Sequence, residues 1–267
     1  MRRGVLAAGV LVAAAAVAIV AVRHGQRAYH STDGATLARF TLHSRLVHAD
    51  LHETLVRPAR TGSGTLLVLL HGRGSTPDSF LSQQFFDGLA ALGRRAPAVL
   101  LLDGGDHSYW HDRRDGRWGT MVLREAIPAG VARTGARKVA IGGISMGGFG
   151  ALELAARQPF RFCAVGGHSP ALWLRAADTA PGAFDDAADF RRNDLLSVAK
   201  RRAVYGSRVW IDAGTDDPFR AADAVLARRL QEQDEQVVLH VWPGGHDKAY
   251  WRRHMGQYLR FYADSCG

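Results

Sequence analysis

Short, continuous apolar runs recur along the chain, and each is followed by a polar loop and then by a segment with helical periodicity. The apolar runs occupy residues 65–70, 98–102, 138–142, 163–167, 209–213 and 237–241. Runs of this kind are typical of strands buried on both faces of a parallel sheet. Helical spacing follows at about 78–92, 121–133, 149–157, 219–233 and 250–262. The alternation predicts an α/β fold with a mostly parallel central sheet and helices on both faces.

Two segments depart from this rhythm. Residues 38–56 alternate polar and apolar positions, which predicts two antiparallel strands ahead of the parallel sheet. Residues 171–202 are polar, rich in alanine and poorly periodic, so we expect an insertion near the active site. Pro128 should kink or end the helix of 121–133.

The N-terminal segment has the pattern of a targeting sequence. Arg2 and Arg3 precede an apolar run from Gly4 to Val22, whose length in a helix approaches the thickness of a membrane's hydrocarbon core. We expect residues 1–30 to be an uncleaved signal anchor or a signal peptide with a linker, and residues 31–267 to be an extracytoplasmic folded domain, membrane-anchored or secreted.

Composition and charge narrow the function classes. The chain is 47% hydrophobic and carries a formal net charge of +9. Its arginines are scattered rather than gathered in a block, so nucleic acid is not an expected partner. The only cysteines are Cys163 and Cys266, and a domain of this size does not need a disulfide framework, so we expect no bridge between them.

The segment around Ser145 carries the strongest chemical pattern. Gly143 and Gly147 flank the serine in a G-x-S-x-G motif, between an apolar strand-like run and a helix-like run. Such a turn holds the serine in a strained conformation with its hydroxyl exposed above the sheet, and the glycines leave room for the chain to approach itself. The motif predicts a nucleophile.

Acid and base candidates follow the serine in an ordered way. A serine hydroxyl needs a base to take its proton, and a carboxylate usually holds that base in one tautomer. Asp216 and Asp217 follow one predicted strand, and His246 follows the next. Ser, Asp and His therefore occur in the chain order of α/β-hydrolases.

Three segments together resemble the esterase branch of the α/β-hydrolases, which includes S-formylglutathione hydrolase (esterase D) and the secreted antigen 85 mycolyltransferases. They are Gly142–Gly148, the run Ile211–Phe219, and Gly244–Asp247 followed by Tyr250 and Trp251. The resemblance extends over about residues 40–262. It implies the α/β-hydrolase fold, a catalytic triad of Ser145, Asp217 and His246, and no cofactor or metal.

Alternatives remain open for the acid and the base. Asp217 matches the family position before Pro-Phe, whereas Asp216 has a competing role as a helix cap and Asp212 as a structural residue at a strand end. For the base, His240 lies within a predicted strand and should pack, while His254 lies on the last helix and should be solvated.

An acyl-transfer site also needs backbone amides directed at the developing negative charge. We expect one from Met146, directly after the nucleophile, and one from Arg73 in the loop His71-Gly72-Arg73-Gly74, which resembles the glycine-rich oxyanion loops of esterases. Gly72 is expected to contact the substrate.

The loop of residues 106–112 allows two readings. His107 and His111, with flanking aspartates, have the spacing of zinc ligands if the loop is helical, but serine catalysis needs no metal. Tyr109, Trp110 and Trp118 could instead form an aromatic wall for the acyl chain or simply pack at the rim, and the family resemblance, which includes an aromatic loop here, favours the wall. Tyr250, Trp251 and Phe261 are expected in the core.

The sequence therefore predicts a serine hydrolase that cleaves carboxylic esters of small molecules or lipids. An acyltransferase related to the mycolyltransferases would use the same triad, with a hydroxyl acceptor in place of water. The antigen 85 proteins carry a glutamate as the acid, so the aspartate here favours the hydrolase. A non-catalytic binding protein is the third possibility, and the complete triad argues against it.

Overall fold

The computed structural model describes residues 29–60 and 62–267. The predicted signal anchor lies outside these residues, apart from its last two positions. No helix in the described part of the chain is both long and apolar enough to cross a membrane.

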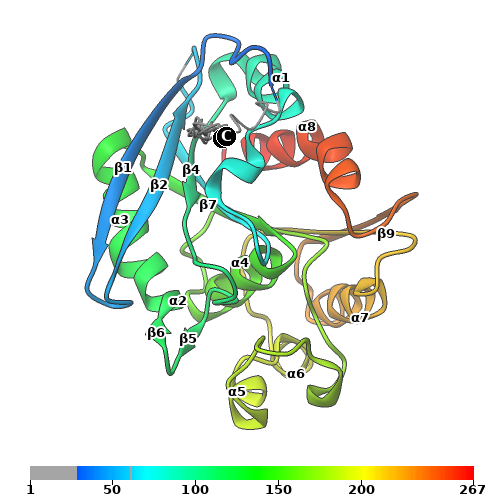
Figure 1. Cartoon of the computed structure of the whole chain (residues 1–267). Coiled ribbons are helices and arrows are strands. Elements are labelled where there is room, and N and C mark those ends of the chain that lie inside the picture. Colours follow the sequence, from blue (N-terminus) through cyan, green and yellow to red (C-terminus); the bar gives the residue numbers. More distant parts are fainter. Residues whose placement is uncertain (1–28, 61) are drawn as a thin grey trace, which may run out of the picture.

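A central mixed sheet organises the molecule (Figure 1). Among the described residues it has eight strands in the order β1-β2-β4-β3-β7-β8-β9-β10. β1 pairs antiparallel with β2, β2 pairs antiparallel with β4, and all later neighbours are parallel, which confirms the predicted fold class. The strands are β1 (Thr36–Ser44), β2 (Ala49–Arg57), β3 (Thr65–Leu70), β4 (Ala98–Leu102), β7 (Lys138–Ile144), β8 (Ala164–His168), β9 (Arg208–Gly214) and β10 (Val237–Trp242).

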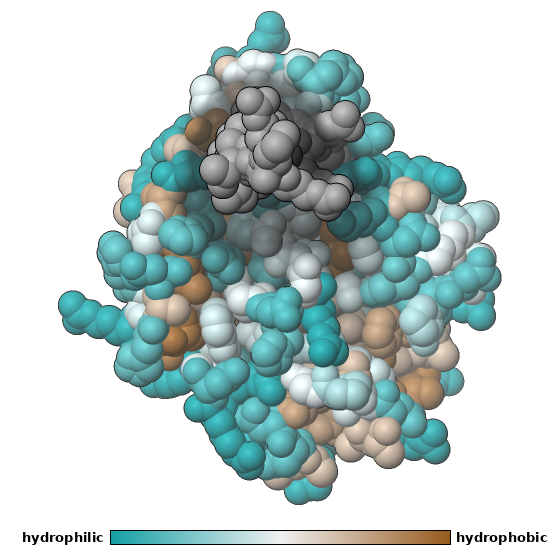
Figure 2. Space-filling view, in the orientation of Figure 1, coloured by the Kyte–Doolittle hydropathy of each residue, from teal (hydrophilic) through white to brown (hydrophobic). Residues whose placement is uncertain are grey.

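Helices cover both faces of this sheet. One apolar cluster joins the sheet to α1 (Gln83–Leu92) and α8 (Lys248–Ser265). The other joins it to α3 (Ile127–Thr134), α4 (Met146–Arg157) and α7 (Arg220–Gln231). β3 is buried at every position, as its unbroken apolar sequence predicts. The face seen in Figure 2 is mostly hydrophilic, with hydrophobic residues in small separate groups.

The helical segment around Pro128 is interrupted, as the sequence predicts. It begins as α2 (Trp118–Met121), widens into a π-helical turn at Val122–Ala126 and continues as α3, with Pro128 in the first turn. Helical backbone continues past Pro128 to Thr134, so the proline leaves one helical hydrogen bond unmade, and the π turn directly before it accommodates this. A short hairpin of β5 (Asp112–Arg113) and β6 (Gly116–Arg117) precedes this segment.

Residues 171–202 connect β8 to β9 and contain short helices only. These are a 3₁₀ turn at Ala176–Asp178, α5 (Ala187–Arg192) and α6 (Leu195–Ala199). The segment starts beside the nucleophile turn, because the Ala171 amide donates to the Ser145 carbonyl at 3.0 Å.

The expectation of unbridged cysteines is wrong. Cys163, directly before β8, forms a disulfide with Cys266, which ends α8, and their Cα atoms are 5.3 Å apart. The bridge ties the last helix to the sheet end opposite Ser145. It could not be read from the sequence because 103 residues separate the two cysteines.

Candidate active site

Ser145 occupies the sharp turn between β7 and α4. Its φ of 56° and ψ of −115° lie outside the region that a side chain with a Cβ prefers. Two backbone hydrogen bonds hold it there: the Ser145 amide donates to His168 at 3.0 Å, and the Phe149 amide donates to the Ser145 carbonyl at 3.0 Å. The strain is thus imposed by β8 on one side and by the first turn of α4 on the other.

The two glycines of the motif are required by close approach. A Cβ on Gly147 would lie 1.9 Å from the Leu70 carbonyl oxygen, and a Cβ on Gly143 would lie 2.3 Å from the Gly147 carbonyl. No side chain fits at either position, so the nucleophile turn packs directly on the end of β3.

His246 lies between Ser145 and Asp217. Its Nε2 is 2.8 Å from the Ser145 hydroxyl, and its Nδ1 is 2.9 Å from a carboxylate oxygen of Asp217. With Nδ1–H donating to the carboxylate, Nε2 is free to accept the hydroxyl proton. The loops after β7, β9 and β10 thus bring three predicted residues into one hydrogen-bonded line.

Asp217 rather than Asp216 faces this histidine. Asp217 is 5% exposed, and its second oxygen accepts the Phe219 amide at 2.9 Å. Burial alone would raise the pKa of Asp217, but hydrogen bonding and the charge of His246 outweigh it and hold that pKa below its ordinary value. Asp216 is exposed, and α7 begins without a side-chain cap, so its expected capping role is wrong.

The other candidate histidines pack against aromatic rings. His240 stacks on Trp242 with ring centroids 4.5 Å apart, as expected for a strand residue. His254 is 7% exposed and lies 4.1 Å from the same indole. The expectation that His254 is solvated is therefore wrong, because α8 turns this position toward the sheet.

The two backbone N–H groups expected to form an oxyanion hole belong to Met146 and Arg73. Met146 is the first residue of α4, where an amide has no intrahelical acceptor. In the loop after β3, the Gly74 amide donates to the Asp106 carbonyl at 2.9 Å, and the Ser75 amide donates to the Gly72 carbonyl at 3.1 Å. Arg73, between them, has no backbone acceptor for its amide among the described residues.

A pocket of about 450 Å³ opens next to Ser145 and His246. Gly72 lines it, as predicted. Its walls come from the β3 loop and the following 3₁₀ turn on one side, and from the start of α8 on the other. The lining residues are Gly72, Arg73, Gly74, Ser75, Ser79, Phe80, Ile144, Ser145, His246, Asp247, Lys248 and Trp251.

Trp251 is the lining residue that sequence reasoning assigned elsewhere. It was expected in the core with Tyr250, but only Tyr250 is fully covered, at 2% exposed. Asp247 caps α8 by accepting the Tyr250 amide, and this cap sets the helix start so that Trp251 turns toward the pocket.

The predicted aromatic wall is not where the sequence placed it. Trp110 is 0% exposed, and its indole N–H donates to the His71 carbonyl at 3.1 Å. Tyr109 is 3% exposed and packs beneath residues 171–202, against Trp173 and Phe184. Both residues lie in the core. There, the hydrogen bond from Trp110 to His71 holds the loop that follows β3.

The side chains of His107 and His111 in the 106–112 loop do not point to one shared site. His111 is buried and contacts Asp189 at 3.0 Å, whereas His107 is exposed. Within residues 29–60 and 62–267, no group of three or more potential metal ligands is found.

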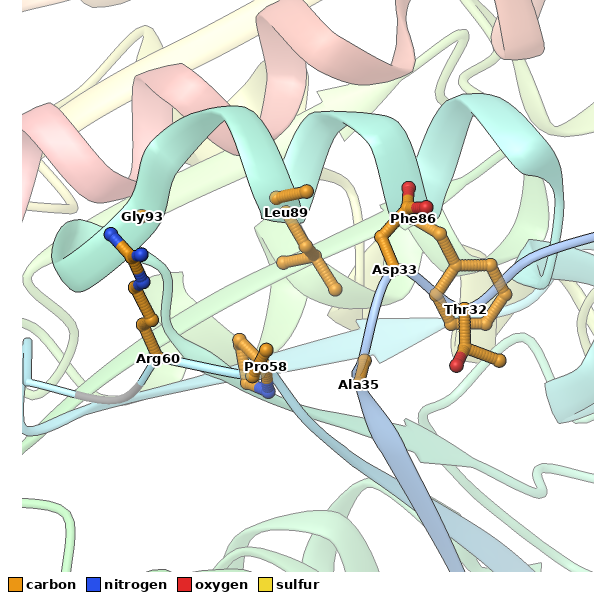
Figure 3. A pocket seen from close by; sticks show the side chains of 10 residues that line it. Thr32, Asp33, Ala35, Pro58, Arg60, Phe86, Leu89 and Gly93 are labelled. Carbon is orange, nitrogen blue, oxygen red and sulfur yellow. The ribbon is translucent and has the colours of Figure 1, made fainter.

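A second hollow of about 190 Å³ lies far from this chemistry, between α1 and the loops that flank β1 and β2 (Figure 3). Leu89, Pro58 and Arg60 are among the side chains drawn there. Within the described residues, its lining includes the Thr32 hydroxyl but no histidine that could serve as a base for it.

The chain is similar to known proteins in sequence and in fold. The family model described as "Putative esterase" matches residues 56–262. Esterase Rv1288 of Mycobacterium tuberculosis (strain H37Rv) is 32% identical over 180 residues, which cover 62% of this chain and 37% of that protein. The chain thus spans well under half the length of this relative.

Solved structures show the same fold. A ferulic acid esterase superposes with a TM-score of 0.75 at 21% identity, covering 87% of this chain and 98% of the other. An S-formylglutathione hydrolase from Agrobacterium tumefaciens superposes with a TM-score of 0.74 at 17% identity. The superposition covers 89% of this chain and 98% of the hydrolase. Both likenesses concern the fold, which is that of the α/β-hydrolases.

Proposed function

Since the chain belongs to this esterase family of carboxylesterase-type hydrolases, we propose that it cleaves carboxylic esters through an acyl-enzyme on Ser145. The observation that carries the proposal is the hydrogen-bonded line from Asp217 through His246 to Ser145, with distances of 2.9 and 2.8 Å. A line of this geometry is what nucleophilic catalysis by a serine requires.

In the first half-reaction, Ser145 Oγ attacks the ester carbonyl while His246 Nε2 takes the hydroxyl proton. Asp217 stabilises the imidazolium that forms and keeps Nδ1 as a donor. The C–O bond to the leaving alcohol then breaks, and His246 returns the proton to that alcohol. In the second half-reaction, water attacks the acyl-enzyme by the same route and releases the carboxylic acid.

The amides of Met146 and Arg73 stabilise the oxyanion formed in each half-reaction. They approach from the start of α4 and from the β3 loop, on either side of Ser145. Because the positive end of the α4 dipole lies at Met146, the helix adds to this stabilisation.

The pocket supports an ester of modest size as substrate. Phe80, Ile144 and Trp251 supply apolar surface, while Ser75 and Ser79 supply hydroxyls. Water reaches the pocket from the exposed residues at its rim, so hydrolysis is favoured over transfer to a sugar or glycerol hydroxyl.

A fluorophosphonate probe tests the proposal directly. Protein lacking residues 1–28 should be labelled at Ser145, and a Ser145→Ala variant should not be labelled. A folded wild-type protein that stays unlabelled would contradict both the esterase and the acyltransferase. A series of p-nitrophenyl esters from acetate upward then sizes the pocket, and acylated product formed from added glycerol or trehalose would favour the transferase.

We further propose that the catalytic domain acts outside the cytoplasm. The Cys163–Cys266 disulfide supports this location, because structural disulfides persist in oxidising compartments. The apolar run from Gly4 to Val22 supports it as well. Protease treatment of spheroplasts expressing the full chain should degrade the domain, and protection from the protease would contradict the location.

A further inference from the structure

A further buried histidine–aspartate pair lies beneath the turn that carries Ser145. His168 Nδ1 is 2.8 Å from Asp212 Oδ1, and the two side chains are 2% and 0% exposed. His168 ends β8, and Asp212 lies near the end of β9. Neither side chain reaches the substrate pocket, so the pair has no place in the acyl-transfer steps themselves.

Aromatic donors complete this pair. The Trp210 indole N–H donates to Asp212 Oδ1 at 2.7 Å. Two tyrosine hydroxyls of α8 donate to Oδ2, that of Tyr250 at 3.0 Å and that of Tyr258 at 2.8 Å. A buried carboxylate is costly unless donors surround it, and here both of its oxygens accept two hydrogen bonds.

A third tyrosine contacts the other ring nitrogen of His168. Tyr262 Oη lies 2.9 Å from His168 Nε2, and Tyr258 stacks on the imidazole with ring centroids 3.6 Å apart. We refer to Asp212, His168, Tyr250, Tyr258 and Tyr262 as the Asp212 cluster.

Tyr262 also reaches the backbone of β7, the strand that ends in the nucleophile. A Cβ on Gly142 would lie 1.8 Å from its hydroxyl, and a Cβ on Gly166 of β8 would lie 1.9 Å from it. The phenol therefore occupies a space that exists only because both strands carry glycine at these positions. It leaves β7 little freedom to shift toward α8.

The cluster contacts or adjoins the backbone segments that carry Ser145, Asp217 and His246. The His168 carbonyl accepts the Ser145 amide at 3.0 Å, and the Asp212 carbonyl accepts the Ser169 amide at 2.7 Å. β9, which carries Asp212, leads within a few residues to Asp217. Tyr250 lies in the first turn of α8, directly after the loop that holds His246.

We propose that the Asp212 cluster is a positioning device that holds Ser145, Asp217 and His246 in register for acyl transfer. The proposal rests on the proposed esterase function. It assigns to Asp212 and His168 a role that acts through the triad, since their side chains make no contact with the pocket.

Tyrosine-to-phenylalanine changes test this role with little change in volume. Tyr262→Phe and Tyr258→Phe each remove one hydroxyl from the cluster. Small misplacements of reacting groups reduce turnover strongly, so each change should lower kcat by about 3- to 30-fold. KM for a short p-nitrophenyl ester should stay within about twofold of the wild type.

Tyr205→Phe is the matched control. Tyr205 is 2% exposed, and its hydroxyl has no hydrogen-bond partner among the described residues. This variant should keep the wild-type kcat. All proteins are assayed at a temperature where circular dichroism shows them folded, and their rates of fluorophosphonate labelling are compared.

The labelling rate should fall with kcat in the cluster variants, because it reports the attack of Ser145 on the probe without a deacylation step. Wild-type kcat in both cluster variants, or an equal loss in Tyr205→Phe, would overturn the positioning role. An unlabelled wild type would instead overturn the proposed function, so the two failures are distinguishable.

Discussion

The indole ring of Trp251 stands edge-on against the imidazole of His246, with ring centroids 5.1 Å apart and planes at 87°. Phe219 contacts the same imidazole, with its centroid 5.1 Å away. The His246 imidazole is therefore held between two aromatic rings, one from the start of α8 and one from just before α7. Of these two rings, only Trp251 also lines the pocket beside Ser145.

Trp251→Leu should affect both catalysis and specificity. Aromatic pairs contribute about 0.5–1.5 kcal/mol beyond burial, so loss of the contact should lower kcat for p-nitrophenyl acetate by roughly 2- to 12-fold. The smaller side chain also enlarges the pocket, so preference should move toward longer acyl chains. Trp242→Leu is the control, because Trp242 packs on His240 and His254 away from the pocket. An unchanged chain-length profile would contradict the assignment.

Asp217→Asn should lower kcat by roughly 10³- to 10⁴-fold, because an amide no longer fixes the tautomer of His246 or stabilises its charge. Asp216→Asn should remain near wild type, since that carboxylate is exposed and does not face the histidine. The comparison uses steady-state rates on one ester, with circular dichroism to verify folding. An active Asp217→Asn protein beside an inactive Asp216→Asn protein would assign the acid to Asp216.

Local patterns were sufficient to predict the sheet. Continuous apolar runs identify strands covered on both faces, and the observed β3 and β4 have the predicted bounds. The reacting loops were predicted for a related reason: parallel strands end at one edge, so residues that directly follow them meet there. Ser145, Asp217 and His246 each follow such a strand.

What the sequence left out depends on contacts between distant segments. Trp110 looks like an exposed loop aromatic, but its side chain fills space left by Gly104 of the same loop and by the distant Gly150 of α4: a Cβ on either glycine would lie within 2.4 Å of it. Trp251 shares the helical periodicity of core residues, and only the Asp247 cap fixes which way it faces. Asp212 was expected to be structural, but the two tyrosine donors to its Oδ2 come from α8, about 40 residues later, and no local pattern signals them.

Gly147→Ala should prevent formation of the native nucleophile turn. The added methyl group would lie 1.9 Å from the Leu70 carbonyl, which belongs to a buried central strand that has no room to move. We expect loss of fluorophosphonate labelling together with a lower melting temperature. Gly256→Ala is the control, because a Cβ there meets nothing within 4 Å, and alanine should stabilise helix α8 by about 0.5–1 kcal/mol. A labelled Gly147→Ala protein would show that the turn tolerates a side chain.

Removing the disulfide should reduce stability but not activity. The Cys163–Cys266 bridge closes a separation of 103 residues, and loss of a native disulfide typically costs about 2–5 kcal/mol. Cys163→Ala/Cys266→Ala should therefore unfold at lower urea concentration than the wild type. Its kcat below the transition should be unchanged, because Cys163 precedes β8 at the end opposite Ser145. Equal urea midpoints for the oxidised wild type and the variant would contradict this role.

Glu53 should make the stability of the protein depend on pH. It lies on β2 at 0% exposure; one oxygen accepts the Asp103 amide at 2.8 Å, and the other has no partner in the described part of the chain. Burial raises the pKa of Glu53 from 4.5 to about 8. The folded state therefore binds this proton more tightly than the unfolded state, so stability is lost as pH rises from about 4.5 to about 8.

Glu53→Gln tests this linkage, because the amide resembles the protonated acid and does not titrate. The variant should match the wild type near pH 4.5 and exceed its free energy of unfolding at pH 7 by on the order of 3 kcal/mol. Urea denaturation at both pH values measures the difference, with the half-exposed Glu232→Gln as a control that should show none. A variant no more stable than the wild type at pH 7 would mean that Glu53 is ionised in the folded protein, with its second oxygen satisfied by water.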